Sequence, residues 1–525
     1  MFTLGCRVIL VSPRMEILEP NTEYVQIKNQ DTVALQSIPV LPYEKFYTTV
    51  VALLNSPENH CVNYYAYPVN RHLKFIACIA NDKTGKIAVM SHEEDHSSPE
   101  IPALSKACFP MHIFEREIHE NFGIKFSGHP WLKPVRFAFN RADKNKVITN
   151  YPFYHIESQE LHQVGVGPIH AGVIEPGHFR FLCNGENVLH LEIQLGWQHR
   201  GIEDLFLRKA SLIQRTVLTE SIAGDTAIGH ALAFASLMES LSDTKINLRL
   251  ELERTLGLEL ERIAVHVGDL GNMNIGTAYQ LAASVFGTLR TPAINYTQTW
   301  CGNRFGKGLI RVGGSHYPFT EELAGKLLTF LNKFKESFDP MSERLFALPS
   351  ALMRFENIGK VSKKQMELIG AVGMAARMAG VERDIRLSHP FAGYKHYPIT
   401  SETLEQGDVW ARAYLRKLEI TNSIEYIRDL VSRLAGLSEK TPQPKGEKEL
   451  RQAPDSLCVS LVEGWRGEIC HCAITDHEGK IKHYKIKDPS AHNWFALALS
   501  LRDLEISDFP INNKSYNLSY CGHDL

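Results

Sequence analysis

The sequence predicts an N-terminal α+β domain over residues 1–140 and a mainly α-helical domain over residues 161–525, which carries β elements at its two ends. The chain has 525 residues, more than one hydrophobic core usually organises. Short apolar runs separated by turn residues fill its first part, and this pattern is typical of β-hairpins. Further along, apolar residues recur at every third or fourth position, which favours amphipathic helices.

Two apolar runs in the first domain predict a β-hairpin. FIACIA (75–80) and KIAVM (86–90) are separated by NDKTG, a sequence rich in turn residues. After this domain, residues 139–160 are polar, contain Pro152 and show no periodicity. Such a composition is typical of an interdomain connection, so we place a linker at residues 141–160.

The larger domain has a helical pattern. Apolar residues from Leu248 to Leu270 advance by three or four positions and predict a long helix with one buried stripe. A second helix is expected over residues 408–434. Residues 436–452 are charged and contain proline, so we expect an exposed loop there, followed by β-strands over residues 457–487.

The charge balance and the hydropathy bear on partners and location. The 57 basic and 59 acidic residues give a formal net charge of -2, which provides no attraction for nucleic acid, and we expect no nucleic-acid partner. No apolar run is long enough to cross a bilayer, and the N-terminal sequence does not resemble a secretory signal. We therefore expect a peripheral protein on the cytoplasmic side of the cell membrane, attached through partner subunits.

The ten cysteines lack the paired spacing of a secreted disulfide framework, and the sequence contains no CxxC motif. The commonest zinc and iron–sulfur motifs are thereby excluded. Cys470 and Cys472 form a CxC in a β-rich stretch. Because side chains alternate along a strand, we expect both thiols on one face as packing residues.

The first motif lies at the end of the N-terminal domain, EREIHENFGIKFSGHPWLKP (115–134). It combines a charged helix end, a helix stop at Gly123 and a turn fixed by Pro130. Its order resembles the signature of the 30-kDa subunit of respiratory complex I. The resemblance implies a structural domain that anchors a neighbouring redox subunit and holds no cofactor of its own.

A second group of motifs opens the larger domain, GPIHAGVIEPGHFRF (167–181) and LHLEIQLGWQHRGIEDL (189–205). Their glycines and prolines allow close backbone approach, while His170, Glu175 and His178 supply side chains that can carry protons. Both stretches resemble the opening of the family formed by the 49-kDa subunit of complex I and the large subunits of nickel–iron hydrogenases.

Further motifs of that family follow in order, namely ELERIAVHVGDLG (259–271), GNRFGKGLIRVGG (302–314), GAVGMAARMAGVERDIR (370–386) and GDVWAR (407–412). In the first of these, Arg262 and His266 share one helix face. The chain is identified as a member of a fused family that joins 30-kDa-like and 49-kDa-like regions and includes the energy-converting (group 4) nickel–iron hydrogenases.

The resemblance also locates the metal ligands of the hydrogenase branch, where four thiolates hold a nickel–iron centre. Other residues occupy those positions here, namely Ala223, Thr226, Ser490 and Asn493, while His230 keeps the register of its motif. Alanine has no donor atom, and neutral hydroxyl or amide groups suit a soft, low-valent metal poorly. We therefore expect no nickel–iron centre in this branch of the family.

For a cleft without nickel and iron, the complex I branch implies a quinone pocket beside an iron–sulfur cluster held by a partner subunit. The family's quinone-facing histidine and tyrosine align near Pro176 and Leu218, and neither is present. Glu175 or His178 is then the expected proton donor. A different metal is the alternative, with the ligands Glu175, His230 and His492.

The family's remaining charged positions fall on Asp225, Arg377, Asp384 and Arg386. Buried carboxylate and guanidinium groups persist only when they are paired. These residues therefore form either a fixed polar network or a route that relays protons and strain. The C-terminal segment, residues 508–525, is rich in hydrogen-bonding side chains, and we expect it to pack back toward the cleft.

Two functional hypotheses follow from the resemblance. In the first, the chain is the large subunit of a membrane-associated oxidoreductase that passes electrons from a partner's iron–sulfur cluster to quinone or another acceptor, coupled to ion translocation. In the second, it is a non-catalytic structural or coupling subunit. The implied partners are an iron–sulfur subunit of the complex I 20-kDa or hydrogenase small-subunit type and integral membrane ion-translocating subunits. NADH binding belongs to other subunits in this family.

Overall fold

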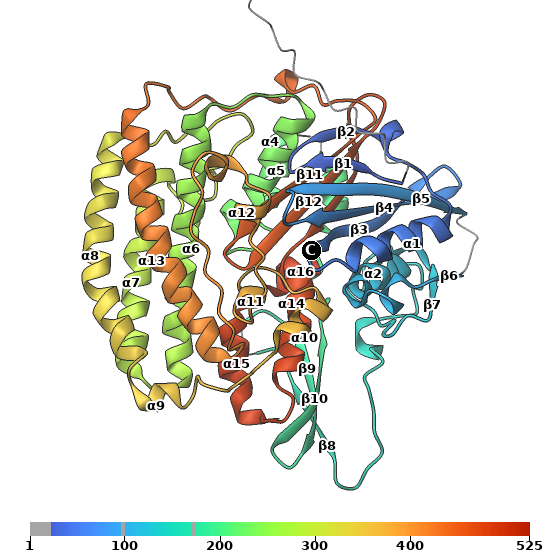
Figure 1. Ribbon diagram of the computed structural model, residues 1–525, viewed down its shortest axis with the longest axis horizontal. Coiled ribbons are helices and arrows are strands. Elements are labelled where there is room, and N and C mark those ends of the chain that lie inside the picture. Colours follow the sequence, from blue (N-terminus) through green and yellow to red (C-terminus); the bar gives the residue numbers. More distant parts are fainter. Residues whose placement is uncertain (1–22, 96–99, 171–173, 210) are drawn as a thin grey trace, which may run out of the picture.

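The computed structural model describes residues 23–95, 100–170, 174–209 and 211–525 and places the longest helices together on one side of the strands (Figure 1). Within these residues, the strands form three four-stranded sheets, with the orders β1-β5-β4-β3, β14-β10-β9-β8 and β13-β12-β11-β2. A further parallel pair consists of β6 (Glu100–Pro102) and β7 (Lys125–Ser127). An N-terminal α+β part is thus followed by a larger part, in the predicted order. The larger part has mixed α and β content, so the prediction of a mainly α-helical domain with β elements at its two ends holds only in part.

The N-terminal sheet is antiparallel and is covered on one face by two helices, α1 (Tyr43–Leu54) and α2 (His112–Phe122). Its strands are β1 (Val25–Lys28), β3 (Asn59–Val69), β4 (His72–Asn81) and β5 (Lys86–Asp95). Strands β4 and β5 pair directly across Asn81 and Lys86, which confirms the predicted hairpin. Helix α2 ends at Gly123, whose φ of 77° is the left-handed conformation that favours glycine at this position.

The opposite face of the N-terminal sheet packs on the C-terminal sheet. This second sheet contains β11 (Ser456–Gly464), β12 (Gly467–Thr475), β13 (Ile481–Lys487) and, from the start of the chain, β2 (Thr32–Ala34). Every residue of β11 and β12 is buried, because helix α5 (Ala227–Leu241) packs on these two strands. The sulfur atoms of Cys470 and Cys472 lie 3.7 Å apart, so both thiols do share one face.

A bundle of long helices forms the left side of the molecule in Figure 1. Its members are α6 (Leu248–Gly276), α7 (Gln280–Cys301), α8 (Glu321–Leu345) and α13 (Val409–Gly436). The two predicted helices are confirmed as α6 and α13. The expectation of a single buried stripe on α6 was wrong, because polar residues such as Arg262 and His266 are fully buried as well. They are buried because other helices supply their charged partners.

The third sheet projects from the lower part of the molecule in Figure 1. A strand near the end of the chain, β14, pairs with its strand β10. The sheet comprises β8 (His162–Val166), β9 (His178–Asn184), β10 (Asn187–Gln194) and β14 (Leu504–Glu505), and its core includes residues of helices α14 (Ser490–Ser500), α15 (Phe509–Tyr516) and α16 (Tyr520–Asp524). The Asp524 carboxylate accepts hydrogen bonds from the main-chain nitrogens of Gly196 and Gln198, each at 2.8 Å. The C-terminal segment thus packs inward, as predicted.

The remaining helices are short and connect these parts. They are α3 (Ile202–Arg208), α4 (Leu212–Thr219), α9 (Pro349–Leu352), α10 (Lys363–Ile369), α11 (Gly373–Arg377) and α12 (Ile385–Ser388). Among the described residues, no helix has both the length and the apolar character that a membrane span requires.

Two glycines allow helix α11 to approach the turn between β11 and β12. Gly373 has a φ of +63°, and a β-carbon on it would lie 2.1 Å from the α-carbon of Gly467. We expect Gly373→Ala to lower the free energy of unfolding by about 2 kcal/mol or more, measured by urea denaturation. Gly325→Ala is the control, since Gly325 lies in a helix with open space around it. An equal effect of the two substitutions would contradict the close approach.

Candidate functional site

The four positions that the sequence analysis assigned to the family's metal ligands lie at the starts of two helices, and the region around them is called the cleft below. Ala223 and Thr226 precede α5, while Ser490 and Asn493 lie in the first turn of α14. All four side chains are buried, with exposed fractions of at most 1%. His230 on α5 joins the two helix starts, because its Nε2 lies 3.1 Å from Oδ2 of Asp488.

Hydrogen bonds within the chain occupy the polar side chains at these positions. Thr226 Oγ1 accepts from Arg466 Nη1 at 3.1 Å, and Ser490 Oγ accepts from the main-chain nitrogen of Ser519 at 3.0 Å. Asn493 exchanges two hydrogen bonds with the main chain of Val372, both at 3.1 Å. A methyl group, two hydroxyls and an amide do not fit a nickel–iron centre, which takes soft sulfur ligands.

Arg466 is a buried cation beside this cleft that the sequence analysis did not single out. Its Nη1 and Nη2 donate to the two carboxylate oxygens of Asp225 at 2.6 and 2.7 Å, and its guanidinium stacks on the Trp465 ring at 3.9 Å. Burial alone lowers the pKa of Arg466, but the Asp225 carboxylate outweighs burial and raises it. Asp225 is therefore held in place by a permanent charge.

A chain of hydrogen bonds extends from the cleft into the C-terminal sheet. Beyond Asp488 and His230, the Nδ1 atom of His230 lies 3.1 Å from Nε2 of His471, and Nδ1 of His471 lies 2.7 Å from the Tyr484 hydroxyl. Burial, together with His230, holds the pKa of His471 well below its usual value, so His471 is neutral. Four titratable groups in contact can pass a proton along their length.

Glu419 on α13 is the centre of a second buried network. Its Oε2 accepts from His266 Nε2 at 2.6 Å and from Arg262 Nη1 at 3.2 Å, and its Oε1 accepts from Arg377. Although burial raises the pKa of Glu419, the guanidinium groups of Arg377 and Arg262 hold this pKa well below the ordinary value. The predicted pairing of Arg262 with His266 on one face of α6 is explained by this shared partner.

Of the charged residues that the sequence singled out, three belong to this network. Arg386 Nη2 donates to Asp384 at 2.6 Å, Arg377 Nε lies 3.9 Å from the same carboxylate, and Arg386 Nη1 lies 3.4 Å from Glu259. Asp225 lies apart from them, paired with Arg466. Glu419 was missed because nothing in its own sequence neighbourhood marks it.

Glu463 is a further carboxyl group in the network around Glu419. Three guanidinium groups, those of Arg262, Arg377 and Arg386, are matched by the carboxylates of Glu259, Asp384 and Glu419. Glu463 is a fourth carboxyl group, and its Oε1 has no hydrogen-bond partner among the described residues. Burial, then the charge of Asp384, raises its pKa to about 8. Glu463 is therefore largely protonated at neutral pH.

The structure does not gather the predicted proton carriers of the 167–178 segment. His170 Nε2 lies 2.8 Å from the carbonyl oxygen of Gly177, whereas Glu175 accepts from the main-chain nitrogen of Cys521 at 3.4 Å. The His178 ring packs on Phe153, and burial lowers its pKa. Each of the three groups thus has a different environment.

The alternative metal site is not formed by the described residues. His230 faces Asp488, while His492 packs against the Phe114 ring and Glu175 lies beside Cys521. Within the described ranges, no group of three histidine, cysteine, aspartate or glutamate side chains has an arrangement suited to a metal ion.

The raised pKa of Glu463 predicts a dependence of stability on pH. In the folded chain the pKa of Glu463 is about 8, above its ordinary value of 4.5. The stabilisation that this group contributes is therefore complete below pH 4.5 and is lost as the pH rises through 8. We expect the free energy of unfolding to fall between pH 5 and pH 8 by on the order of 2–4 kcal/mol from this group. Urea denaturation of Glu463→Gln, which keeps an oxygen acceptor for the main-chain nitrogen of Ile385, should show a flatter pH profile. An unchanged slope would contradict the assignment.

The chain is similar in sequence to known subunits of hydrogenase and NADH-quinone oxidoreductase complexes. The chain is 24% identical to hydrogenase-4 component G of Escherichia coli over 434 residues, which cover 79% of this chain and 74% of that protein. It is also 24% identical to an NADH-quinone oxidoreductase protein of Phocaeicola vulgatus over 415 residues, covering 73% of this chain and 78% of that protein. Relatives of both kinds therefore share most of the length of this chain.

A solved structure shares the fold. A chain of the membrane-bound sulfane sulfur reductase, an archaeal respiratory membrane complex, superposes with a TM-score of 0.64 at 21% identity and covers 71% of this chain and 100% of its own. Residues 44–141 match the family described as the respiratory-chain NADH dehydrogenase 30 Kd subunit, and residues 280–524 match the 49 Kd subunit of the same enzyme. The chain thus joins, in one polypeptide, a region of the 30 Kd subunit family and a region of the 49 Kd subunit family of respiratory-chain NADH dehydrogenase.

Proposed function

We propose that this chain is the large subunit of a membrane-associated, complex I-related oxidoreductase. In that complex, electrons pass from an iron–sulfur cluster of a partner subunit to quinone or another acceptor, and their transfer drives ion translocation in membrane subunits. The chain lies at the cytoplasmic face. The observation that carries the proposal is that two separate sets of paired charges, Asp225–Arg466 at the cleft and the Glu419 network in the helix bundle, both contact the turn between β11 and β12.

The turn between β11 and β12 connects the cleft to the bundle. On its cleft side, Trp465 Nε1 donates to the carbonyl oxygen of Asp225 at 2.9 Å. On its bundle side, Arg262 Nη2 donates to the carbonyl oxygen of Glu463 at 3.0 Å. A change of charge at Asp225 or Arg466 therefore acts on the same turn that Arg262 holds. Such a connection suits a protein that links a reaction in the cleft to movement elsewhere.

We do not propose that this complex produces or consumes hydrogen. The residues at the expected ligand positions supply no thiolate, and their polar groups are hydrogen-bonded within the chain. Reduction of a quinone instead takes two electrons, from the partner's cluster, and two protons. Glu175 or His178 is the proposed proton donor, and the Asp488–His230–His471 chain is a separate set of groups that can carry protons in this region.

A second candidate function is a non-catalytic coupling subunit. The complete burial of the four ligand positions favours it, because side chains that are satisfied within the chain offer nothing to a substrate. In this case the cleft serves only to hold Arg466 and Asp225, and the turn transmits conformational change that arises in a partner.

The two candidates differ in their response to substitution in the intact complex. We expect purified complexes to contain no stoichiometric nickel and to show no hydrogen turnover. Quinone reduction should fall at least tenfold in Glu175→Gln or His178→Gln and in His230→Gln, within the usual range for loss of an acid–base group. His396→Gln is the control, since that side chain is 42% exposed. Normal turnover in every variant would favour the coupling subunit, and one nickel per chain would contradict both candidates.

A further inference from the structure

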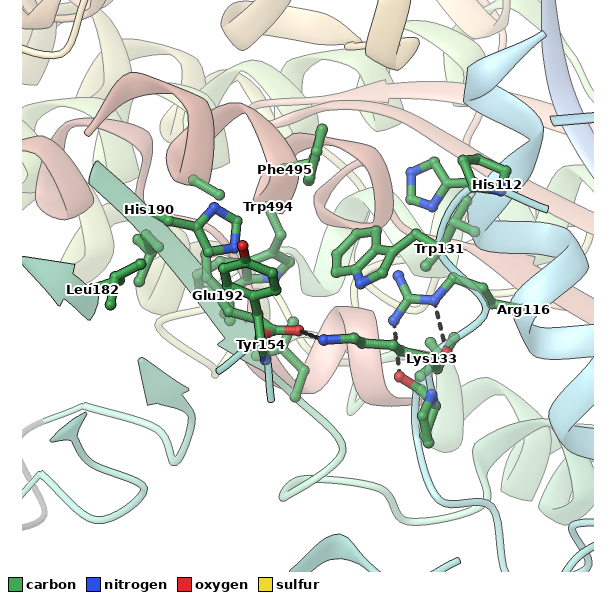
Figure 2. A pocket seen from close by; sticks show the side chains of 18 of the residues that line it. His112, Arg116, Trp131, Lys133, Tyr154, Leu182, His190, Glu192, Trp494 and Phe495 are labelled. Atoms are coloured by element: carbon green, nitrogen blue, oxygen red, sulfur yellow. Dashed lines mark hydrogen bonds and ion pairs between the residues drawn. The ribbon is translucent and has the colours of Figure 1, made fainter. Parts of the chain in front are cut away.

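A cavity of about 600 Å³ lies at the junction of the two parts of the chain. Its walls come from α2 and the segment 130–135, from the linker, and from β9, β10 and α14 (Figure 2). Neither the metal positions nor the charge networks described above contribute to it. Its size is that of a site for a small organic molecule.

Aromatic rings form much of the wall. Trp131 and Phe495 face each other with ring centroids 5.4 Å apart, and Phe109 lies 5.5 Å from Phe495. Trp494 and Tyr154 belong to the same cavity. Flat apolar walls of this kind favour a planar, conjugated ligand, because stacking adds to the effect of apolar burial.

His112 is a polar group in this wall that lacks a partner. It is 2% exposed, and neither ring nitrogen has a hydrogen-bond partner within the described parts of the chain. Figure 2 shows its ring beside Trp131 at the edge of the cavity. Burial keeps the pKa of His112 well below its usual value, so the ring is neutral and offers one donor and one acceptor. Because His112 also lines the cavity, a ligand atom there can accept or donate the hydrogen bonds that the chain does not supply.

Arg116 gives the cavity a positive charge. Its Nε and Nη2 donate to the carbonyl oxygens of Lys133 and Pro134, both at 2.8 Å, and its guanidinium stacks on Trp131 at 4.2 Å. The other cation in the wall, Lys133, is paired with Glu192. The hydrogen bonds of Arg116 go to neutral carbonyl groups, and the carboxylates of Glu120 and Glu192 act on its charge without a direct ion pair, so a negatively charged oxygen can still bind to it directly.

We propose that this cavity binds a planar aromatic or conjugated molecule with a carboxylate or a similarly acidic oxygen, which His112 and Arg116 recognise. The rings of Trp131 and Phe495 hold its flat body. The inference is independent of the proposed function, because no residue of the cleft is involved. A ligand here bridges the two parts of the chain and stabilises their junction by binding the folded form.

Isothermal titration calorimetry on the purified full chain tests this inference with 2-naphthoate as the probe. We expect saturable binding at one site. The affinity for 2-naphthylmethylammonium, which has the same rings and the opposite charge, should be lower by a factor of about ten or more. His112→Phe keeps the ring volume and removes the hydrogen bonds, and it should weaken 2-naphthoate binding about fivefold or more. Leu189→Trp, at a wall position that is 37% exposed, should fill the cavity and abolish binding.

His92→Phe is the matched control for His112→Phe. His92 is also buried, neither of its ring nitrogens has a hydrogen-bond partner among the described residues, and its Nδ1 lies 3.7 Å from the Glu94 carboxylate. Its ring packs between Phe46 and Phe75, outside the cavity. This variant should bind 2-naphthoate as the wild type does. No saturable binding by the wild type, equal binding of the anion and the cation, or equal binding by His112→Phe and His92→Phe would each overturn the inference. Loss of quinone turnover in cleft variants would leave these results unchanged.

Discussion

Glu419 is the residue on which the arrangement of the larger part of the chain depends. Two guanidinium groups and an imidazole from α6 and α11 converge on this carboxylate of α13, all in the protein interior. A charge buried at such depth is tolerated only when its partners are present with good geometry. The three elements therefore have one permitted arrangement, which sets the position of the β11–β12 turn and, through it, of the cleft.

The same requirement for partners is met at the four positions that the sequence analysis assigned to metal ligands. Arg466 and Asp225 pair directly, and Thr226, Ser490 and Asn493 form hydrogen bonds with groups of the chain. Each polar atom that would otherwise be buried alone has a partner. The framework around these positions is thus held together by pairing within the chain.

Local patterns in the sequence predict much of the fold, because the hairpin of β4 and β5 and the helices α6 and α13 each follow from their own periodicity. The burial of the polar side of α6 could not be predicted from the sequence. Arg262 and His266 have the polarity of a solvent-exposed helix face, and their buried partner, Glu419, lies more than 150 positions away in the chain. The family motifs identify Arg377, Asp384 and Arg386 as a group. No local signal marks His471, Arg466 or the cavity beside His112, because these depend on contacts between distant segments.

The most direct test of this account is the stability of the chain when Glu419 loses its charge. We expect Glu419→Gln to lower the free energy of unfolding by about 3–5 kcal/mol, because Arg262 and Arg377 lose their shared carboxylate in the interior. Glu425→Gln on the same helix is the control, and its side chain is 54% exposed, so its effect should stay within about 0.5 kcal/mol. Urea denaturation of both variants at pH 7 measures the difference. A loss below about 1 kcal/mol for Glu419→Gln, or equal losses for the two variants, would contradict the central place of this carboxylate.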